Sequence, residues 1–186
     1  FHDQAARQWY GASAKLIPCT TFSEVFAAYD DGSADAIVTA VENTLFGSIN
    51  EVYRYIEECD APIVGEIKLP VEQMLVGLPG AKISDITEVY SHPVALSQCR
   101  RFLQKRLSQA TPIEFFDTAG AVEFIKQNGS RHCAAIAGQM AAELYDLPIL
   151  EDSIHDNPDN ITRFLVIEPT DRPVDANRAS LVITTD

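Results

Sequence analysis

Residues 36–59 read AIVTAVENTLFGSINEVYRYIEEC, and this stretch decides the fold class. Its first part, Ala36 to Val41, is a short apolar run typical of a buried strand. Its last part, from about Ile49 to Cys59, carries apolar residues at helical spacing and predicts an amphipathic helix. A polar turn, ENT at residues 42–44, separates the two. A buried strand that leads through a polar turn into a helix is typical of an α/β protein.

The same alternation of strands and helices continues in both directions from this stretch. The expected strands are 14–18, 36–41, 63–69, 73–77, 86–90, 113–116, 133–137 and 163–167, and the expected helices are 4–10, 22–30, 49–59, 93–107, 119–127 and one that ends at Leu144. Such an order predicts βαβ units and largely parallel sheets.

Composition bounds the partners of the chain. The 186 residues are 46% hydrophobic and 22% charged, which suits one domain or two small lobes with a real core. The net charge of −13 argues against nucleic acid, because phosphate binding needs a dense basic face. No apolar run approaches the ~18 residues of a membrane helix, and no signal peptide is visible. We therefore expect a cytoplasmic protein with neither nucleic-acid nor membrane partners.

The four cysteines, Cys19, Cys59, Cys99 and Cys133, are evenly scattered and show no metal-ligand spacing. Buried free thiols in a reducing compartment are the favoured interpretation. We accordingly expect neither a metal site nor a cofactor.

Three expected strands end in a short polar turn at which a helix is expected to begin. The turns are Asn43-Thr44, Ser91-His92 and Asp117-Thr118. Ligands of open α/β sheets bind outside the carboxyl ends of the strands, and helix N-termini attract anions. Each turn alone is also an ordinary helix cap. Their recurrence at one topological place favours a small anionic ligand.

A second polar cluster, DNITRF at residues 159–164, precedes the last strong strand. Arg163 offers a planar fork that suits a carboxylate, and the Thr162 hydroxyl is a neutral proton donor. The alternative makes Thr162 an ordinary strand residue and Arg163 a surface charge. On spacing alone the alternative is favoured.

At these residues the sequence resembles the prephenate dehydratase family. The blocks that carry the resemblance are AVENTLFGSINEVY (residues 40–53), VYSHPVALSQCRRFL (89–103) and NITRF (160–164). Three further blocks support it: GEIKLPVEQML, DTAGAVEFI and AAIAGQMAAELYDLPIL. All of them follow the family's order and cover nearly all of residues 1–168.

The resemblance implies an α/β fold of two lobes, similar to type II periplasmic binding proteins, with mixed, mostly parallel sheets and a cleft between the lobes. Residues 1–70 and 158–168 would form the first lobe and 71–157 the second. Residues 169–186 would be a linker and the start of a truncated ACT regulatory domain. Hinge closure on the substrate is the natural expectation for two crossings between lobes.

The activity that the resemblance implies is a carbon–oxygen lyase reaction, the decarboxylating dehydration of prephenate to phenylpyruvate in phenylalanine biosynthesis. Thr162 would be the catalytic residue that protonates the departing hydroxyl, and Arg163 would bind a carboxylate of this small dicarboxylate substrate. The substrate-binding positions that match the family are Glu42, Asn43, Thr44, Ser91, Gln98, Thr118 and Arg163. Glu42 has an alternative role, orienting Asn43 or the helix terminus.

Two other functions stay open from the residues. An arogenate dehydratase would act on the amino analogue of prephenate. A non-catalytic module of the same two-lobe architecture would bind a small carboxylate without converting it. The family further implies a homodimer, and phenylalanine as an effector only where the ACT domain is present.

Overall fold

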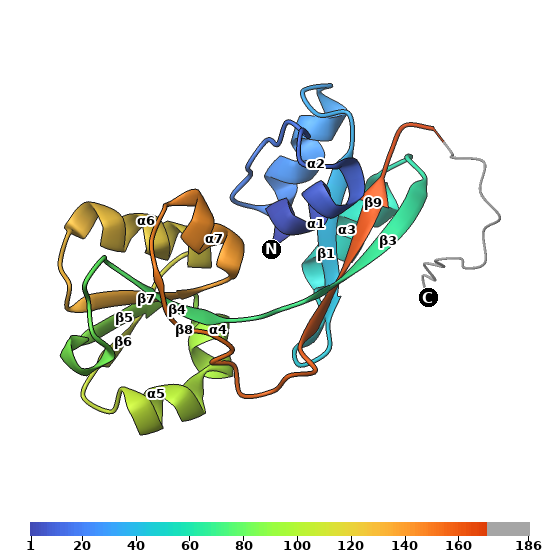
Figure 1. Cartoon of the computed structure of the whole chain (residues 1–186). Helices are drawn as coiled ribbons and strands as arrows, with labels where there is room; N and C mark the ends of the chain where they lie inside the picture. The colour runs from blue at the N-terminus through green and yellow to red at the C-terminus, as the bar shows by residue number, and fades with distance from the viewer. Residues whose placement is uncertain (171–186) are drawn as a thin grey trace. The chain divides into compact units, whose positions relative to one another are not determined.

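The computed structural model describes residues 1–170, which form two compact units (Figure 1). Unit 1 comprises residues 1–70 together with the segment that begins at Ile161, and unit 2 comprises Val71–Asn160. The sequence places the crossings between lobes near Pro70 and Pro158; in the structure the chain leaves unit 1 after Pro70 and returns after Asn160. The regulatory strand expected from Ala179 lies outside the described residues.

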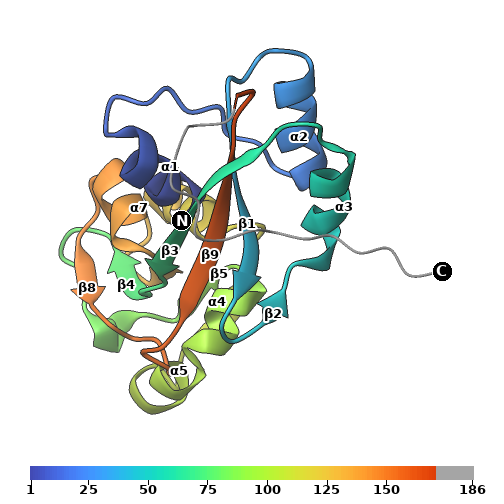
Figure 2. The ribbon, with the colours of Figure 1, turned by 90° about the vertical axis from the view of Figure 1, so that its right-hand side faces the viewer.

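Unit 1 is a four-stranded sheet covered by helices. Its elements are α1 (His2–Tyr10), α2 (Phe22–Asp30), β1 (Ile37–Asn43), β2 (Gly47–Ser48), α3 (Asn50–Glu58), β3 (Ile63–Pro70) and β9 (Ile161–Ile167). The strand order is β2-β1-β9-β3, and β9 is antiparallel to both of its neighbours (Figure 2). β1 and β3 therefore run in the same direction, as a βαβ unit requires, with the last strand inserted between them.

Strand alternation divides the core of unit 1 between the two faces of its sheet. On one face, α1 packs against a cluster that includes Ala40 and Phe164. On the other, α2 and α3 cover a cluster that includes Val41 and Leu165. The two clusters fix which face each residue of β9 occupies, and this decides the geometry of the site.

Unit 2 is a five-stranded sheet with longer helical connections. Its elements are β4 (Met74–Gly77), the 3-10 helix η1 (Ile83–Asp85), β5 (Glu88–Ser91), α4 (Pro93–Gln98), α5 (Arg100–Arg106), β6 (Thr111–Glu114), α6 (Thr118–Asn128), β7 (Cys133–Ala137), α7 (Gln139–Leu144) and β8 (Ile149–Glu151). The strand order is β6-β5-β7-β4-β8. β5 is parallel to β6 and β7, so the ends of β5 and β6 lie at one edge of the sheet.

The α/β class with mixed sheets is confirmed, whereas the expectation of mostly parallel pairing needs correction. Among the described residues, the pairs β1–β2, β1–β9, β3–β9, β4–β7 and β4–β8 are antiparallel, and only β5–β6 and β5–β7 are parallel. The reason is that β9 and β4 each enter the middle of a sheet against the direction of their neighbours. A pattern of alternating elements carries no information about such insertions.

Three local expectations also differ from the structure. Residues 14–18 form no strand, because they pair with no neighbouring strand of the described chain. The helix expected over 93–107 is interrupted at Cys99, where φ is −111° and ψ is 19°. The Asp156 carboxylate accepts hydrogen bonds from the Arg101 N–H at 3.1 Å, so a residue distant in sequence satisfies the first turn of α5. The short strands β2 and β8 were not expected.

Candidate active site

The side chains of Asn43 and Thr162 meet at the end of β1 and the start of β9. Asn43 Nδ2 donates a hydrogen bond to Thr162 Oγ1 at 3.0 Å, and both residues are half-buried. Because Thr162 accepts in this contact, its own hydroxyl hydrogen is not used there. The structure thus brings together the expected acid and one of the expected binding residues.

The orientation of the Asn43 amide is determined by its other atom. Its Oδ1 accepts hydrogen bonds from Leu45 N at 2.9 Å and from Phe46 N at 3.2 Å. These backbone groups can only donate, so the oxygen must face them and the nitrogen must face Thr162. This turn leads into the β1–β2 hairpin. The Asn43-Thr44 pair therefore caps no helix, in contrast to what the recurrence of strand-to-helix turns suggested.

A β-bulge in β1 sets up the contact between Asn43 and Thr162. Ala40 lies opposite Phe164, but the next paired residue of β1, Glu42, lies opposite Arg163, so Val41 is the extra residue. Asn43 then falls opposite Thr162. In a regular ladder, Glu42 would occupy that place and would present a carboxylate to the hydroxyl.

Thr44 continues the pairing of β1 with β9 beyond the end of the strand. Thr44 N donates to Ile161 O and Thr44 Oγ1 accepts from Ile161 N, both at 2.9 Å. Thr44 thus binds both the N–H and the C=O of Ile161, the residue that precedes Thr162.

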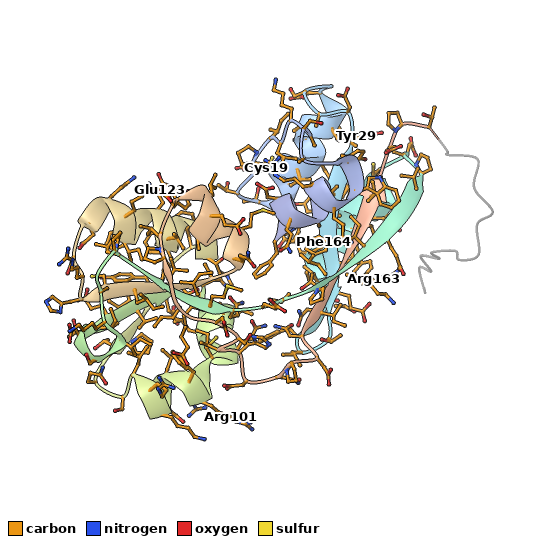
Figure 3. The ribbon with its side chains drawn as sticks, viewed as in Figure 1. Cys19, Tyr29, Arg101, Glu123, Arg163 and Phe164 are labelled. Atoms are coloured by element: carbon orange, nitrogen blue, oxygen red, sulfur yellow. The ribbon has the colours of Figure 1, made fainter. Side chains whose placement is uncertain are left out.

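Arg163 projects from the opposite face of the sheet to Thr162. Consecutive strand residues alternate, and Phe164, two residues after Thr162, lies on the α1 face (Figure 3). The Arg163 guanidinium donates through Nε to Glu66 at 2.7 Å and lies 3.7 Å from the Glu42 carboxylate. Glu66 was not foreseen from the sequence. The contact of Glu42 with Arg163 gives Glu42 a role other than those expected for it.

Ser91 ends β5 in unit 2 and is fully buried. Its hydroxyl donates a hydrogen bond to Ile136 O of the neighbouring β7 at 2.6 Å. His92 follows as the N-cap of α4, and its Nδ1 accepts from Val94 N at 3.2 Å. The role of Ser91 in substrate binding stays a prediction, because the structure shows its hydroxyl bound to the sheet.

Gln98 ends α4 and is only 7% exposed. Its side-chain Oε1 accepts a hydrogen bond from Gln73 Nε2 at 3.1 Å, and Gln73 is 2% exposed. Gln73 is the one site-related residue of unit 2 that the sequence analysis missed. The signal was present, because a glutamine directly before the apolar run of β4 has to be satisfied by another polar group.

Thr118 is the first residue of α6, next to Asp117, whose carboxylate accepts from Gly120 N at 2.6 Å. Asp117 therefore caps the helix as predicted. The Phe116 ring lies over the first turn, where a Cβ added to Gly120 would come within 2.6 Å of it. Since β6 and β5 are parallel neighbours, Ser91 at the end of β5 and Thr118 shortly after the end of β6 lie at one edge of the sheet.

The histidines contribute contacts rather than a catalytic pair. His2 Nε2 accepts from Ala40 N at 3.4 Å, beside the bulge, and its ring meets the Phe164 ring edge-on at 5.1 Å. His155 Nδ1 accepts from Gln73 N at 3.4 Å. His2 thus has partners that the sequence did not reveal, and His155 belongs to the surroundings of the two glutamines.

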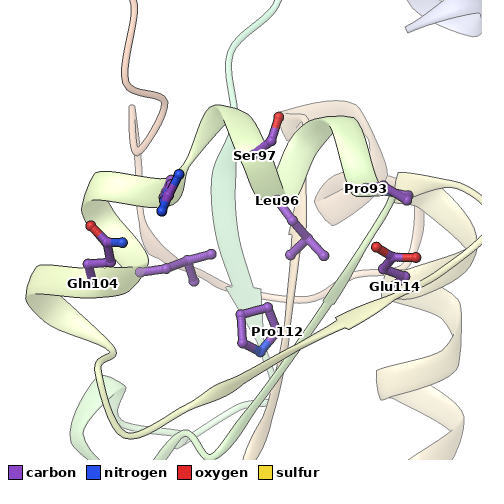
Figure 4. Close-up of a pocket in the computed structure, with 8 residues that line it drawn as sticks. Pro93, Leu96, Ser97, Gln104, Pro112 and Glu114 are labelled. Carbon is purple, nitrogen blue, oxygen red and sulfur yellow. The ribbon is translucent and has the colours of Figure 1, made fainter.

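A surface pocket of about 400 Å³ lies between α4, α5 and β6 (Figure 4). Its lining is Pro93, Leu96, Ser97, Arg100, Leu103, Gln104, Pro112 and Glu114. None of the expected site residues is part of that lining. The pocket is therefore separate from the candidate site.

Residues 1–170 contain no group of three or more His, Cys, Asp or Glu side chains placed to hold a metal ion. Over the same residues, no helix combines the length and apolarity needed to cross a membrane.

Cys99 is fully buried, and burial together with the nearby Asp156 charge raises the pKa of its thiol to about 12.

Comparison with known proteins identifies the family. The family model described as prephenate dehydratase matches residues 1–172. Arogenate dehydratase 3 of Arabidopsis thaliana is 42% identical over 93% of this chain and 42% of its own length. The bifunctional chorismate mutase/prephenate dehydratase of Aquifex aeolicus is 38% identical over 98% of this chain and 50% of its own length.

A solved structure agrees with these relatives. Prephenate dehydratase from Arthrobacter aurescens, in complex with L-Phe, superimposes with a TM-score of 0.82 at 28% identity, over 97% of this chain and 59% of that one. The chain thus spans about half the length of the curated relatives that it matches. On the match of residues 1–172 and these identities, the chain belongs to the prephenate dehydratase family.

Proposed function

We propose that this protein catalyses the decarboxylating dehydration of prephenate to phenylpyruvate, as a carbon–oxygen lyase. Family membership supports the reaction class. The single structural observation that carries the proposal is the hydrogen bond from Asn43 Nδ2 to Thr162 Oγ1, with the Asn43 amide held by the backbone of its own turn.

The reaction requires one proton and no redox change. The bond from the ring to the carboxylate breaks and releases carbon dioxide, and its electron pair enters the ring. The ring then expels its hydroxyl group, which leaves as water after taking a proton. Prephenate and one proton thus give phenylpyruvate, carbon dioxide and water. The enzyme has to hold the substrate and supply that proton at the departing oxygen.

Thr162 supplies the proton in this proposal, and Asn43 makes it a better donor. A threonine hydroxyl is a weak acid, so its transfer of a proton depends on stabilising the oxygen that remains. The Asn43 N–H already points at Oγ1 and stabilises negative charge as it develops there. The same contact directs the Thr162 hydrogen away from Asn43, toward an acceptor such as the substrate hydroxyl. The proton is then replaced from water.

The remaining residues bind and position the substrate in this proposal. Arg163 binds a carboxylate, which takes the place of Glu42 at 3.7 Å while the 2.7 Å contact with Glu66 holds the guanidinium. Because the Arg163 side chain leaves β9 on the face opposite to Thr162, this carboxylate has to extend around the start of the strand. Gln98 and Thr118 contribute from unit 2. Thr44 holds the start of β9 by its two bonds to Ile161.

The test is turnover by the purified protein with prephenate and with arogenate in parallel. Phenylpyruvate and phenylalanine are measured as the two products, and Thr162→Ala is assayed beside the wild type. We expect turnover of prephenate that falls ~10²–10⁴-fold in a folded Thr162→Ala protein. Conversion of arogenate alone would assign the other dehydratase activity. Binding of prephenate without turnover in the wild type would assign a binding module and overturn the proposal.

The setting of the enzyme is a further part of the proposal. We propose a cytoplasmic homodimer, by analogy with the family, and light scattering of the purified protein tests the dimer. One solved relative holds L-Phe. We propose feedback by phenylalanine only for a chain that carries a complete regulatory domain.

A further inference from the structure

Gln73 and Gln98 form a pair of buried carboxamides in unit 2. Gln73 lies directly before β4 and is 2% exposed, and Gln98 at the end of α4 is 7% exposed. The only direct bond between their side chains runs from Gln73 Nε2 to Gln98 Oε1 at 3.1 Å. Within the described residues, Gln73 Oε1 is buried and has no hydrogen-bond partner.

This arrangement is unfavourable if Gln73 serves packing alone. A buried acceptor without a partner destabilises the fold, and an apolar side chain of the same length would avoid that loss. The residues that follow, from Met74 to Gly77, are buried and apolar or glycine, so an apolar residue would suit this place. The amide is therefore explained by what its N–H does to Gln98.

The backbones of both glutamines are held by one segment, residues 154–156. Ile154 N donates to Gln73 O at 2.9 Å, and His155 Nδ1 accepts from Gln73 N at 3.4 Å. Asp156 N donates to Gln98 O at 2.7 Å. With both backbones held, the hydrogen bond between the side chains is left to set the rotation of the Gln98 amide.

We propose that Gln73 is a positioning residue that turns the Gln98 amide so that its NH₂ group, rather than its oxygen, is presented to a carboxylate of the substrate. The inference rests on the proposed function, in which Gln98 binds the substrate. A carboxylate accepts hydrogen bonds only, so the opposite rotation of Gln98 would repel it. By donating to Gln98 Oε1, Gln73 occupies the oxygen and leaves the NH₂ group for the ligand.

The experiment is a double-mutant cycle on the full protein with Gln73→Met and Gln98→Met. Methionine matches glutamine in length and cannot donate to Gln98. We expect Gln73→Met to raise KM for prephenate about tenfold, the loss of one hydrogen bond to a charged group, with kcat changed much less. The double variant should then be no worse than Gln98→Met alone, because Gln73 acts only through Gln98.

Two further variants separate positioning from packing. Gln73→His, whose ring N–H can still donate to Gln98, should restore most of the affinity. Gln73→Asn keeps a carboxamide but is too short to reach, and it should behave like Gln73→Met. If the Gln73→Met protein does not fold, the polar Gln73→Asn variant serves as the test in its place. A wild-type KM in Gln73→Met or Gln73→Asn, or effects that add in the double variant, would overturn the inference.

Failure of this inference and failure of the proposed function give different experimental results. Failure of the dehydratase assignment appears in the wild type, as absent turnover of prephenate. Failure of the present inference appears in the variants, against a wild type that is active. The same cycle run on the Kd of prephenate, measured by calorimetry, gives the answer where binding occurs without turnover.

Discussion

The two groups of expected site residues differ in how the fold uses them. In unit 1, Asn43 and Thr162 are half-buried, and their side chains contact each other rather than the core. In unit 2, Ser91 and Gln98 are almost fully buried, and their polar atoms are bound to Ile136 and Gln73. In the proposed function, the proton transfer therefore belongs to unit 1, whereas the residues of unit 2 act from a well-packed interior.

This difference has a physical cause in the two sheets. β9 begins beside the end of β1, and a bulge sets Asn43 opposite Thr162 at that margin. Ser91 is the last residue of β5, which lies between β6 and β7, so its hydroxyl is enclosed by the sheet. Substitutions of Asn43 or Thr162 should therefore change the rate with little loss of stability, whereas substitution of Ser91 should mainly lower the stability.

Among the partners of Thr162, Asn43 should give the largest effect when it is replaced by aspartate. The aspartate keeps an oxygen for the N–H groups of Leu45 and Phe46, but it replaces the donor to Thr162 by an acceptor. The Thr162 hydrogen is then drawn to residue 43 rather than to the substrate. We expect kcat to fall ~10²-fold with an unchanged midpoint of thermal unfolding. A variant that keeps its kcat would remove Asn43 from the mechanism.

Ser91→Ala should show the opposite behaviour. It removes the hydroxyl that satisfies Ile136 O inside the sheet, and we expect the free energy of unfolding to fall by about 1–3 kcal/mol. The measurement is denaturant unfolding, with Ser97→Ala as the matched control, since Ser97 is an exposed serine of the following helix α4 and its hydroxyl donates to Val94 O. An unchanged stability combined with a raised KM would make Ser91 a substrate contact instead.

Arg163→Lys tests whether the face of β9 opposite to Thr162 also contributes to substrate binding. Lysine keeps the charge but loses the planar fork that can hold Glu66 and a substrate carboxylate together. We expect KM to rise about tenfold with little change in kcat. Steady-state kinetics decides this, and an unaltered KM would leave Arg163 as an ion-pair partner of Glu66 alone.

The smallest effect is expected at Cys99, which should not react at all in the folded protein. Because burial raises the pKa of its thiol to about 12, the thiolate fraction at pH 8 is on the order of 10⁻⁴. Treatment with iodoacetamide followed by mass spectrometry should find Cys59, which is half-buried, modified before Cys99. Early modification of Cys99 would mean that the junction of α4 and α5 opens in solution.

Local patterns in the sequence predicted most elements of the fold. The helix over Phe22–Asp30 and the strand over Cys133–Ala137 begin and end where the structure has them, because apolar spacing and caps act within a few residues. The failures depend on distant residues. The break at Cys99 depends on Asp156, and the direction of β9 depends on which strands it enters between.

The candidate site shows the same division. The resemblance named Asn43 and Thr162, and the structure places them 3.0 Å apart, but the bulge that aligns them is invisible in a strand pattern of period two. Glu66 was missed because it matters only through Arg163, which lies far along the chain. For Gln73 the position before an apolar run was a signal, but its partner Gln98 could not be read from the sequence. That Arg163 points away from the Thr162 face follows from adjacency in a strand and was foreseeable.

The most direct test of the account replaces the hydroxyl of Thr162 alone. Valine has nearly the shape of threonine without the hydroxyl, and serine keeps the hydroxyl without the methyl group. With prephenate as substrate, we predict that Thr162→Val loses ~10²–10⁴-fold in kcat at unchanged thermal stability, and that Thr162→Ser stays within about tenfold of the wild type. A valine variant that forms phenylpyruvate at the wild-type rate would show that the proton comes from elsewhere, and would contradict the central claim.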